Sequence, residues 1–141
     1  PVASPEWDTI RQCRIGILFQ DLKIFPELTA IENIELKNRL QAYKSEAEID
    51  DMLRRLEISD KSRQPCGKLS WGQQQRVAII RALCQPFDFL LLDEPISHID
   101  DRMARIVAEL IAEEVASRQA AVVVSSIGKE LPMTYDNILN L

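Results

Sequence analysis

Two adjacent carboxylates, Asp93 and Glu94, follow a short apolar run, FLLL at residues 89–92. Such a run is typical of a strand in a parallel sheet that helices cover on both faces. Pro95 cannot donate a backbone hydrogen bond, so we expect strand pairing to stop there. Ligands of open α/β sheets bind at the carboxyl ends of strands, where paired acids suit a hard cation that carries phosphate oxygens. Taken alone, the two acids fit a solvated corner between strand and loop equally well.

A second candidate group is LSWGQ, residues 69–73, which stands where a helical pattern begins. A helix N-terminus offers unpaired N–H groups and a partial positive charge. Ser70 adds a hydroxyl, and Gly72 lets a ligand approach the backbone closely. Together these features would make a phosphate site, whereas a single serine before a helix is more commonly a plain N-cap.

The first half of the chain must position these groups through one strand and two capped helices. RIGILF, residues 14–19, indicates a short buried strand. Thr29 and Ser45 each precede a glutamate by three positions, which predicts a capping box at the start of each helix. We expect the first of these helices to end near Leu40, and the polar segment 58–68 to form a loop.

The second half reads as a buried helix followed by strands and one more helix. Residues 70–84 are apolar nearly all round after a polar first turn, which indicates a buried helix. An amphipathic helix should end near Arg118, and residues 121–124 read as a second buried strand. NILNL, residues 137–141, has the pattern of a third strand in this half. The order predicts an α/β layer with a helical insertion.

Composition excludes several classes of protein. The chain has 141 residues, enough for one core, with 46% apolar and 28% charged residues. Its net charge of −5, without a basic block, argues against nucleic acid as the main partner. Its apolar runs are too short to cross a bilayer. Cys13, Cys66 and Cys84 lack metal-ligand spacing, so we expect buried or inert thiols in a reducing cytosol.

Four segments together resemble the ATP-binding cassette (ABC) ATPases. FQ at 19–20, LSWGQQQRVAIIRAL at 69–83, FLLLDEP at 89–95 and SHID at 97–100 are similar to that family's Q-loop, signature motif, Walker B strand and D-loop. They occur in the family's order, and the resemblance extends from about Arg14 to the end of the chain. It implies an α/β fold: an incomplete P-loop NTPase domain with a partial parallel sheet and a helical signature subdomain.

The resemblance implies catalytic and metal-binding roles at the carboxyl end of the strands. Asp93 would hold Mg²⁺ through water, and Glu94 would orient or deprotonate the attacking water. Gln20 would touch both the metal and the water, and its loop would report the nucleotide state to a membrane partner.

The resemblance also implies a nucleotide shared between two subunits. Ser70, Gly72 and Gln73 would bind the γ-phosphate of an ATP molecule held by a second ABC ATPase domain. Asp100 would lie at that dimer interface, beside the nucleotide. Transmembrane permease subunits would be the other partners, docked at residues 26–34.

Two departures from the family pattern bear on catalysis. A P-loop requires GxxxxGK followed by Ser or Thr, and neither Gly-Lys pair of this chain, at 67–68 and 128–129, meets that pattern. The family has this loop upstream of the Q-loop, so we expect an ABC domain without its N-terminal lobe. Ile127 stands where the family has a histidine that contacts the γ-phosphate, and His98 is the only histidine in the chain.

The implied function is that of an ATP-binding subunit whose ATP hydrolysis drives transport, located in the cytoplasm against the inner face of the membrane through its permease. Residues 1–20 would end the N-terminal lobe at the Q-loop, residues 21–84 would form the helical subdomain, and residues 85–141 would form the Walker B and D-loop part. The alternative is a degenerate, non-hydrolysing module for regulation or dimerisation. In either case, sheet edges and faces left uncovered should make the isolated chain oligomeric or domain-swapped.

Overall fold

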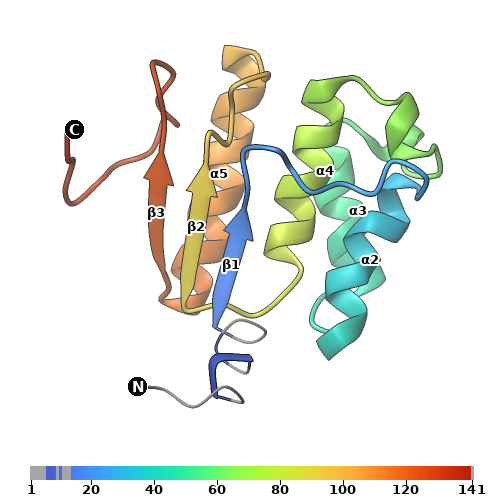
Figure 1. The fold of residues 1–141 in the computed structure, drawn as a ribbon, viewed down its shortest axis with the longest axis horizontal. Helices are drawn as coiled ribbons and strands as arrows, with labels where there is room; N and C mark the ends of the chain where they lie inside the picture. Colours follow the sequence, from blue (N-terminus) through green and yellow to red (C-terminus); the bar gives the residue numbers. More distant parts are fainter. Residues whose placement is uncertain (1–5, 9, 11–13, 141) are drawn as a thin grey trace.

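The protein contains a three-stranded parallel sheet in the order β1-β2-β3 (Figure 1). The computed structural model describes residues 6–8, 10 and 14–140. The strands are β1 (Ile15–Leu18), β2 (Phe89–Asp93) and β3 (Ala121–Ser125). Leu92 pairs with Leu18 on one side and with Val124 on the other, so all three strands end at the same edge. The predicted α/β class is confirmed, and so are the strands predicted at residues 14–19, 89–92 and 121–124.

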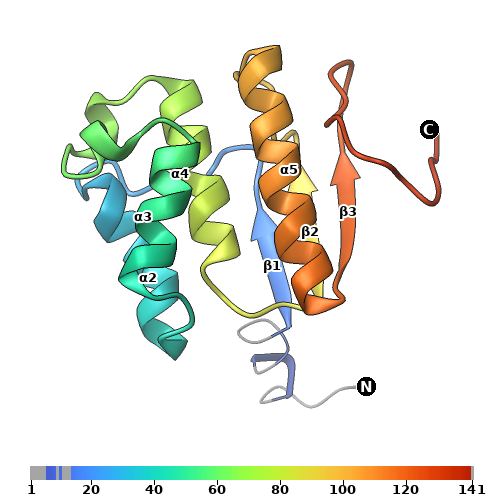
Figure 2. The same ribbon diagram turned by 180° about the vertical axis from the view of Figure 1, so that it is seen from behind.

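Helices cover one face of this sheet and extend beyond its β1 edge (Figures 1 and 2). Helix α5 (Asp101–Arg118) runs along the back of the sheet in Figure 1 and in front of β2 in Figure 2. Helix α4 (Trp71–Leu83) lies beside α5 near β1, and it packs in turn against α2 (Ala30–Gln41) and α3 (Glu46–Arg55). Two short 3₁₀ turns, Ser59–Lys61 and Cys66–Lys68, connect α3 to α4.

Both predicted capping boxes are present. Thr29 caps α2 and Ser45 caps α3, and in each case the glutamate three residues later hydrogen-bonds back to the cap residue's N–H. Helix α2 ends at Gln41, and the residue after it, Ala42, takes a left-handed conformation. These local signals therefore place the helix starts within one residue of the positions expected from the sequence.

The core forms between α4, its neighbouring helices and one face of the sheet. Val77, Ile79, Ile80 and Leu83 of α4 are each at most 1% exposed, which confirms the helix predicted to be buried. Leu90 and Leu92 of β2 lie on the face of the sheet that packs against the helices, and both side chains are buried. Cys66 and Cys84 are buried as predicted, while Cys13 lies outside the described residues.

The prediction from the apolar runs alone, that β2 and β3 are covered on both faces, is wrong, whereas the uncovered apolar sheet face expected for the isolated chain is present. Phe89 is 50% exposed, Leu91 36% and Val123 58%, whereas their neighbours along each strand point toward the helices. Ile17 of β1 belongs to the same open face, at 40% exposed. The reason is that α4 and α5 share one side of the sheet, and no described element packs on the other (Figures 1 and 2). We call these four residues the bare sheet face.

The predicted strand at residues 137–141 is also wrong, because residues 137–140 have no strand structure and Leu141 lies outside the described residues. After β3 the chain turns through Gly128, whose φ is +90°. Lys129 then donates to the carbonyl of Ile99, and Leu131 is buried. These contacts lead the chain away from the outer edge of β3, so the last residues have no strand beside them to pair with (Figure 1).

Ion pairs connect the α3 region to α5. Lys44 pairs with Glu114 at 2.8 Å, and both side chains are nearly buried. Arg55 pairs with Glu113, and Glu57 pairs with Arg102, through two hydrogen bonds each. Within the part of the chain that the structure describes, every helix is too short or too polar to span a bilayer.

Candidate functional site

Asp93 occupies the carboxyl end of the central strand. It pairs in register with Ser125 of β3, whose Oγ donates to Asp93 Oδ1 at 2.5 Å. The carboxylate is exposed to solvent, with one oxygen oriented by this hydroxyl. An exposed, oriented carboxylate at a strand end is suited to a hydrated cation.

Glu94, the first residue after β2, has a left-handed backbone with φ of +49°. Such a conformation costs a non-glycine residue about 1–3 kcal/mol and persists only where its surroundings fix it. Here the Glu94 N–H donates to the carbonyl of Ser125 at 2.9 Å, and the Ile127 N–H donates to Glu94 Oε1 at 2.5 Å. The turn thus separates the two acids and directs the Glu94 carboxylate toward the end of β3.

Ile127 reaches Glu94 through its backbone alone. Its side chain is 91% exposed and offers no polar group, as the sequence indicated. The N–H contact with Glu94 does not depend on the side chain, so every residue type except proline could make it at position 127.

Ser70 caps α4 and is engaged with Gln73. The Gln73 N–H donates to Ser70 Oγ at 3.2 Å, and the Ser70 N–H donates to Gln73 Oε1 at 2.9 Å. This capping box begins the helix in an exposed position. Two predicted site residues, Ser70 and Gln73, are therefore in contact. Each side chain hydrogen-bonds to the backbone N–H of the other residue, and both bonds stabilise the start of α4.

Gly72 is required by an internal contact. A Cβ atom at this position would lie 2.5 Å from the carbonyl oxygen of His98. The backbone at the start of α4 therefore packs directly against the backbone of residues 94–100, which we call the β2–α5 loop. The close approach that the sequence suggested for a phosphate is made in this structure with the protein's own loop, and Trp71 adds an edge-on ring contact with His98 at 5.6 Å between centroids.

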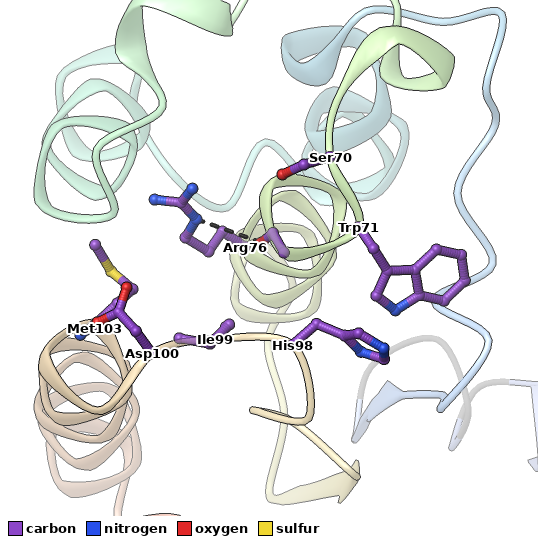
Figure 3. A pocket seen from close by; sticks show the side chains of 8 residues that line it. Ser70, Trp71, Arg76, His98, Ile99, Asp100 and Met103 are labelled. Carbon is purple, nitrogen blue, oxygen red and sulfur yellow. Dashed lines mark hydrogen bonds between the residues drawn. The ribbon is translucent and has the colours of Figure 1, made fainter.

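An open groove of about 340 Å³ lies between the start of α4 and the β2–α5 loop (Figure 3). Its lining residues are Ser70, Trp71, Gly72, Arg76, His98, Ile99, Asp100 and Met103. Arg76 donates to the carbonyls of Leu56 and Gly72, and burial lowers the pKa of its guanidinium. The groove therefore places a cation and the positive end of α4, which favours anions, opposite the carboxylate of Asp100.

Asp100 is the N-cap of α5 and lines the same groove. Its Oδ1 accepts a hydrogen bond from the Met103 N–H at 2.9 Å, and this bond lowers the pKa of the Asp100 carboxyl. The starts of α4 and α5 thus face each other across the groove, with Ser70 on one side and Asp100 on the other (Figure 3).

Gln20 lies at the same sheet edge as Asp93. It follows Leu18 by two residues, and Leu18 pairs with Leu92 in the parallel register. Its side chain is exposed. The structure thus gathers Gln20, Asp93 and Glu94 at the strand ends, and it gathers Ser70, Gly72 and Asp100 around the groove.

Gln75 links these two groups and was missed by reasoning from the sequence. Its Nε2 donates to the Glu94 carbonyl at 2.8 Å, and its Oε1 accepts from the His98 N–H at 3.1 Å. The side chain is 1% exposed. Three consecutive glutamines do not reveal which one is buried, but Gln75 lies three residues after Gly72 and so shares its helix face.

The carboxylates at the strand ends, Asp93 and Glu94, could supply only part of the ligand shell of a metal ion. Among the described residues, no group of three or more His, Cys, Asp or Glu side chains is placed to hold a metal ion. Mg²⁺ commonly uses one or two carboxylates, completing its shell with water and substrate phosphates. Asp93, exposed at the strand end, suits that smaller contribution.

Comparison with known proteins gives consistent relatives. A family model described as ABC transporter matches residues 2–97. The lipoprotein-releasing system ATP-binding protein LolD of Desulfotalea psychrophila is 32% identical over 142 residues, covering 96% of this chain and 62% of that protein. The arginine transport ATP-binding protein ArtM of Bacillus subtilis is 35% identical over 131 residues, covering 88% of this chain and 54% of that protein.

A solved structure also matches the fold. The dimeric structure of MJ0796, a bacterial ABC transporter cassette, superposes with a TM-score of 0.74 at 30% identity, covering 88% of this chain and 57% of that chain. The same cassette has been solved in a post-hydrolysis state bound to ADP and Pi, with the same similarity. The chain thus spans little more than half the length of the relatives described here.

Proposed function

The chain belongs to the ABC transporter family, and from this membership we propose that it forms the signature-bearing part of an ATP-binding subunit whose ATP hydrolysis drives transport. The observation that supports this most is the arrangement of two acids at the parallel strand ends beside a groove flanked by two helix starts. In this arrangement the groups that would hold a metal ion, accept a proton and bind phosphate lie at one end of the molecule.

In this proposal Asp93 and Gln20 would hold Mg²⁺, whose positive charge neutralises the phosphate oxygens of ATP. Glu94 would orient or deprotonate the attacking water. Its left-handed turn and the Ile127 N–H keep its carboxylate in a fixed place, which an acid–base group requires.

Ser70, Gly72 and Gln73 would bind the γ-phosphate of ATP held by a second ABC domain. The start of α4 presents backbone N–H groups without helical partners, and Arg76 adds positive charge to the groove. Asp100, on the opposite side of the groove, would meet the partner domain. The dimeric structure of the related cassette supports a shared site of this kind.

Permease subunits would be the further partners, with residues 26–34 as their docking segment and the cytoplasmic face of the membrane as the location. Helix α2 begins within this segment, at Ala30. We also propose the division into residues 1–20, 21–84 and 85–141. The pairing of β1 with β2 supports a sheet part built from the first and third segments, and the helical composition of α2, α3 and α4 supports the second.

The proposed phosphate contact is tested by calorimetric titration of the whole gene product with MgATP. Ser70→Arg fills the groove beside α4 and should weaken or abolish binding by the assembled subunit. Ser117→Arg is the matched control, because Ser117 is exposed at the far end of α5 and should leave the titration unchanged. Equal affinities for both variants would argue against a nucleotide contact at Ser70.

A further inference from the structure

The buried amide of Gln75 is used on both its nitrogen and its oxygen. Nε2 donates to the carbonyl of Glu94 at 2.8 Å and also contacts Ser97 Oγ at 3.2 Å. Oε1 accepts from the N–H of His98 at 3.1 Å. One side chain on α4 therefore satisfies a backbone acceptor and a backbone donor of the β2–α5 loop.

The backbone of Glu94 is fixed from two directions. Its N–H is bound to the Ser125 carbonyl at the end of β3, and its C=O is bound to Gln75 on α4. Between these two contacts φ is +49°, a conformation that a glutamate adopts only under constraint. The Glu94 carbonyl also accepts from the Ser97 N–H within the loop, at 3.4 Å, so Gln75 supplies the shorter of its two hydrogen bonds and the one that comes from α4.

Gly72 brings α4 close to the same loop one helical turn earlier. The space for a Cβ atom at Gly72 is filled by the His98 carbonyl. Residues three apart on a helix lie on one face, so Gly72 and Gln75 contact the loop side by side. The loop is thus held to α4 at His98 by both residues and at Glu94 by Gln75.

We propose that Gln75 is a positioning residue, which holds the backbone of Glu94 and thereby aims its carboxylate. The inference rests on the proposed function of Glu94. An amide fits this position because the loop presents a carbonyl and an N–H together. An apolar side chain of similar size would leave the His98 N–H unpaired and the Glu94 carbonyl with only its 3.4 Å contact to the Ser97 N–H. The contact also ties the orientation of the Glu94 carboxylate to the position of α4, which carries Ser70.

Amide hydrogen exchange of the 141-residue chain tests the contact without any nucleotide. In Gln75→Leu and in Gln75→Asn, whose shorter amide does not reach the loop, the His98 N–H should exchange about tenfold faster or more relative to amides inside α4. Gln74→Leu is the matched control, because Gln74 bonds to the Leu69 carbonyl instead of the loop. Unchanged His98 exchange in a folded Gln75 variant would overturn the proposal.

Steady-state ATP hydrolysis by the whole gene product tests the positioning itself. Gln75→Leu should lower kcat about tenfold or more, because small displacements of a catalytic group are costly, while KM for MgATP stays within about twofold. Gln74→Leu should change neither constant. If the wild-type protein does not hydrolyse ATP, the proposed function is overturned. The hydrogen-exchange experiment would in that case still decide whether the Gln75 contact exists. Hydrolysis by Gln75→Leu at the wild-type kcat would overturn the positioning role.

Discussion

At the scale of single residues, the candidate site depends on backbone contacts as much as on side-chain chemistry. Asp93, Glu94 and Ser70 were predicted from their types and spacing, and the structure places them at the strand ends and at a helix start. The partners of Glu94 were not predictable, because the Ser125 carbonyl and the Ile127 N–H are backbone groups that every sequence carries. Gln75 was missed because its burial follows from the packing of α4 on the β2–α5 loop.

Gly72→Ala tests the closest of these contacts. The new methyl group would lie 2.5 Å from the His98 carbonyl oxygen, so the loop must shift. We expect a loss of about 1–3 kcal/mol in the free energy of unfolding, measured by urea denaturation. Gly67→Ala is the control, since its nearest neighbour would lie 3.2 Å away. A larger loss for Gly67→Ala than for Gly72→Ala would contradict the packing described here.

The buried cysteines make a second prediction at this scale. Burial raises the pKa of the Cys84 thiol to about 12, and burial also raises the pKa of Cys66. Since a raised thiol pKa disfavours the reactive thiolate, native Cys84 should react with iodoacetamide at pH 8 at least about 100-fold more slowly than in the denatured chain. Peptide mass spectrometry reports each cysteine separately. Rapid labelling of Cys84 in the native protein would show that this part of the core opens readily.

At the scale of secondary-structure elements, local signals were sufficient where the cause is local. The capping boxes at Thr29 and Ser45 place α2 and α3, and hydrophobic periodicity locates α4 and α5. Whether helices pack on one face or on both faces of β2 and β3 could not be predicted from the local sequence, because a short apolar run is compatible with either arrangement. Residues 137–140 likewise form no strand. A strand needs a neighbouring strand to pair with, and the pattern of these residues does not show whether one lies beside them.

The ion pairs between the α3 region and α5 give an element-scale prediction. Burial is the largest single effect on Lys44 and by itself lowers its pKa, but the hydrogen bonds and charges of Glu114 and Glu48 together outweigh burial and raise the pKa of the lysine. The side chains of Lys44 and Glu114 are only 10% and 12% exposed, and Lys44 keeps Glu48 as a second partner. Glu114→Gln should therefore lower the free energy of unfolding by about 2 kcal/mol, the usual contribution of a hydrogen bond to a charged group.

The neighbouring Glu113→Gln is the matched control. Glu113 is 61% exposed in its pair with Arg55, so its loss should cost less than about 1 kcal/mol. Chemical denaturation of both variants provides the comparison. Equal costs would mean that the buried pair contributes no more to the attachment of α3 than a surface pair does.

At the scale of the whole molecule, the bare sheet face is the most conspicuous surface. Ile17, Phe89, Leu91 and Val123 place apolar side chains in solvent across all three strands. Contiguous apolar surface of this kind marks an interaction site or promotes association. The expectation that the isolated chain self-associates therefore has a structural basis in this face, and it remains a prediction.

Light scattering of the 141-residue chain over a range of concentrations tests this prediction. The wild-type chain should form dimers or larger species, and the double variant Leu91→Lys with Val123→Lys should shift the population toward monomer, because charge on this face disfavours its burial. Leu40→Lys is the control, since Leu40 is 68% exposed on α2, away from the sheet. A wild-type chain that stays monomeric at high concentration would contradict the prediction.

The most direct test of the proposed function is ATP turnover by the whole gene product with Glu94→Gln. If Glu94 activates the attacking water, the variant should lose about 100-fold or more in kcat while it still binds MgATP. Asp88→Asn is the control and should retain turnover, because Asp88 is an exposed acid directly before the first residue of β2, at the end of the strand away from Glu94. Loss of turnover confined to Glu94→Gln would support the site, whereas turnover at the wild-type rate in Glu94→Gln would contradict it.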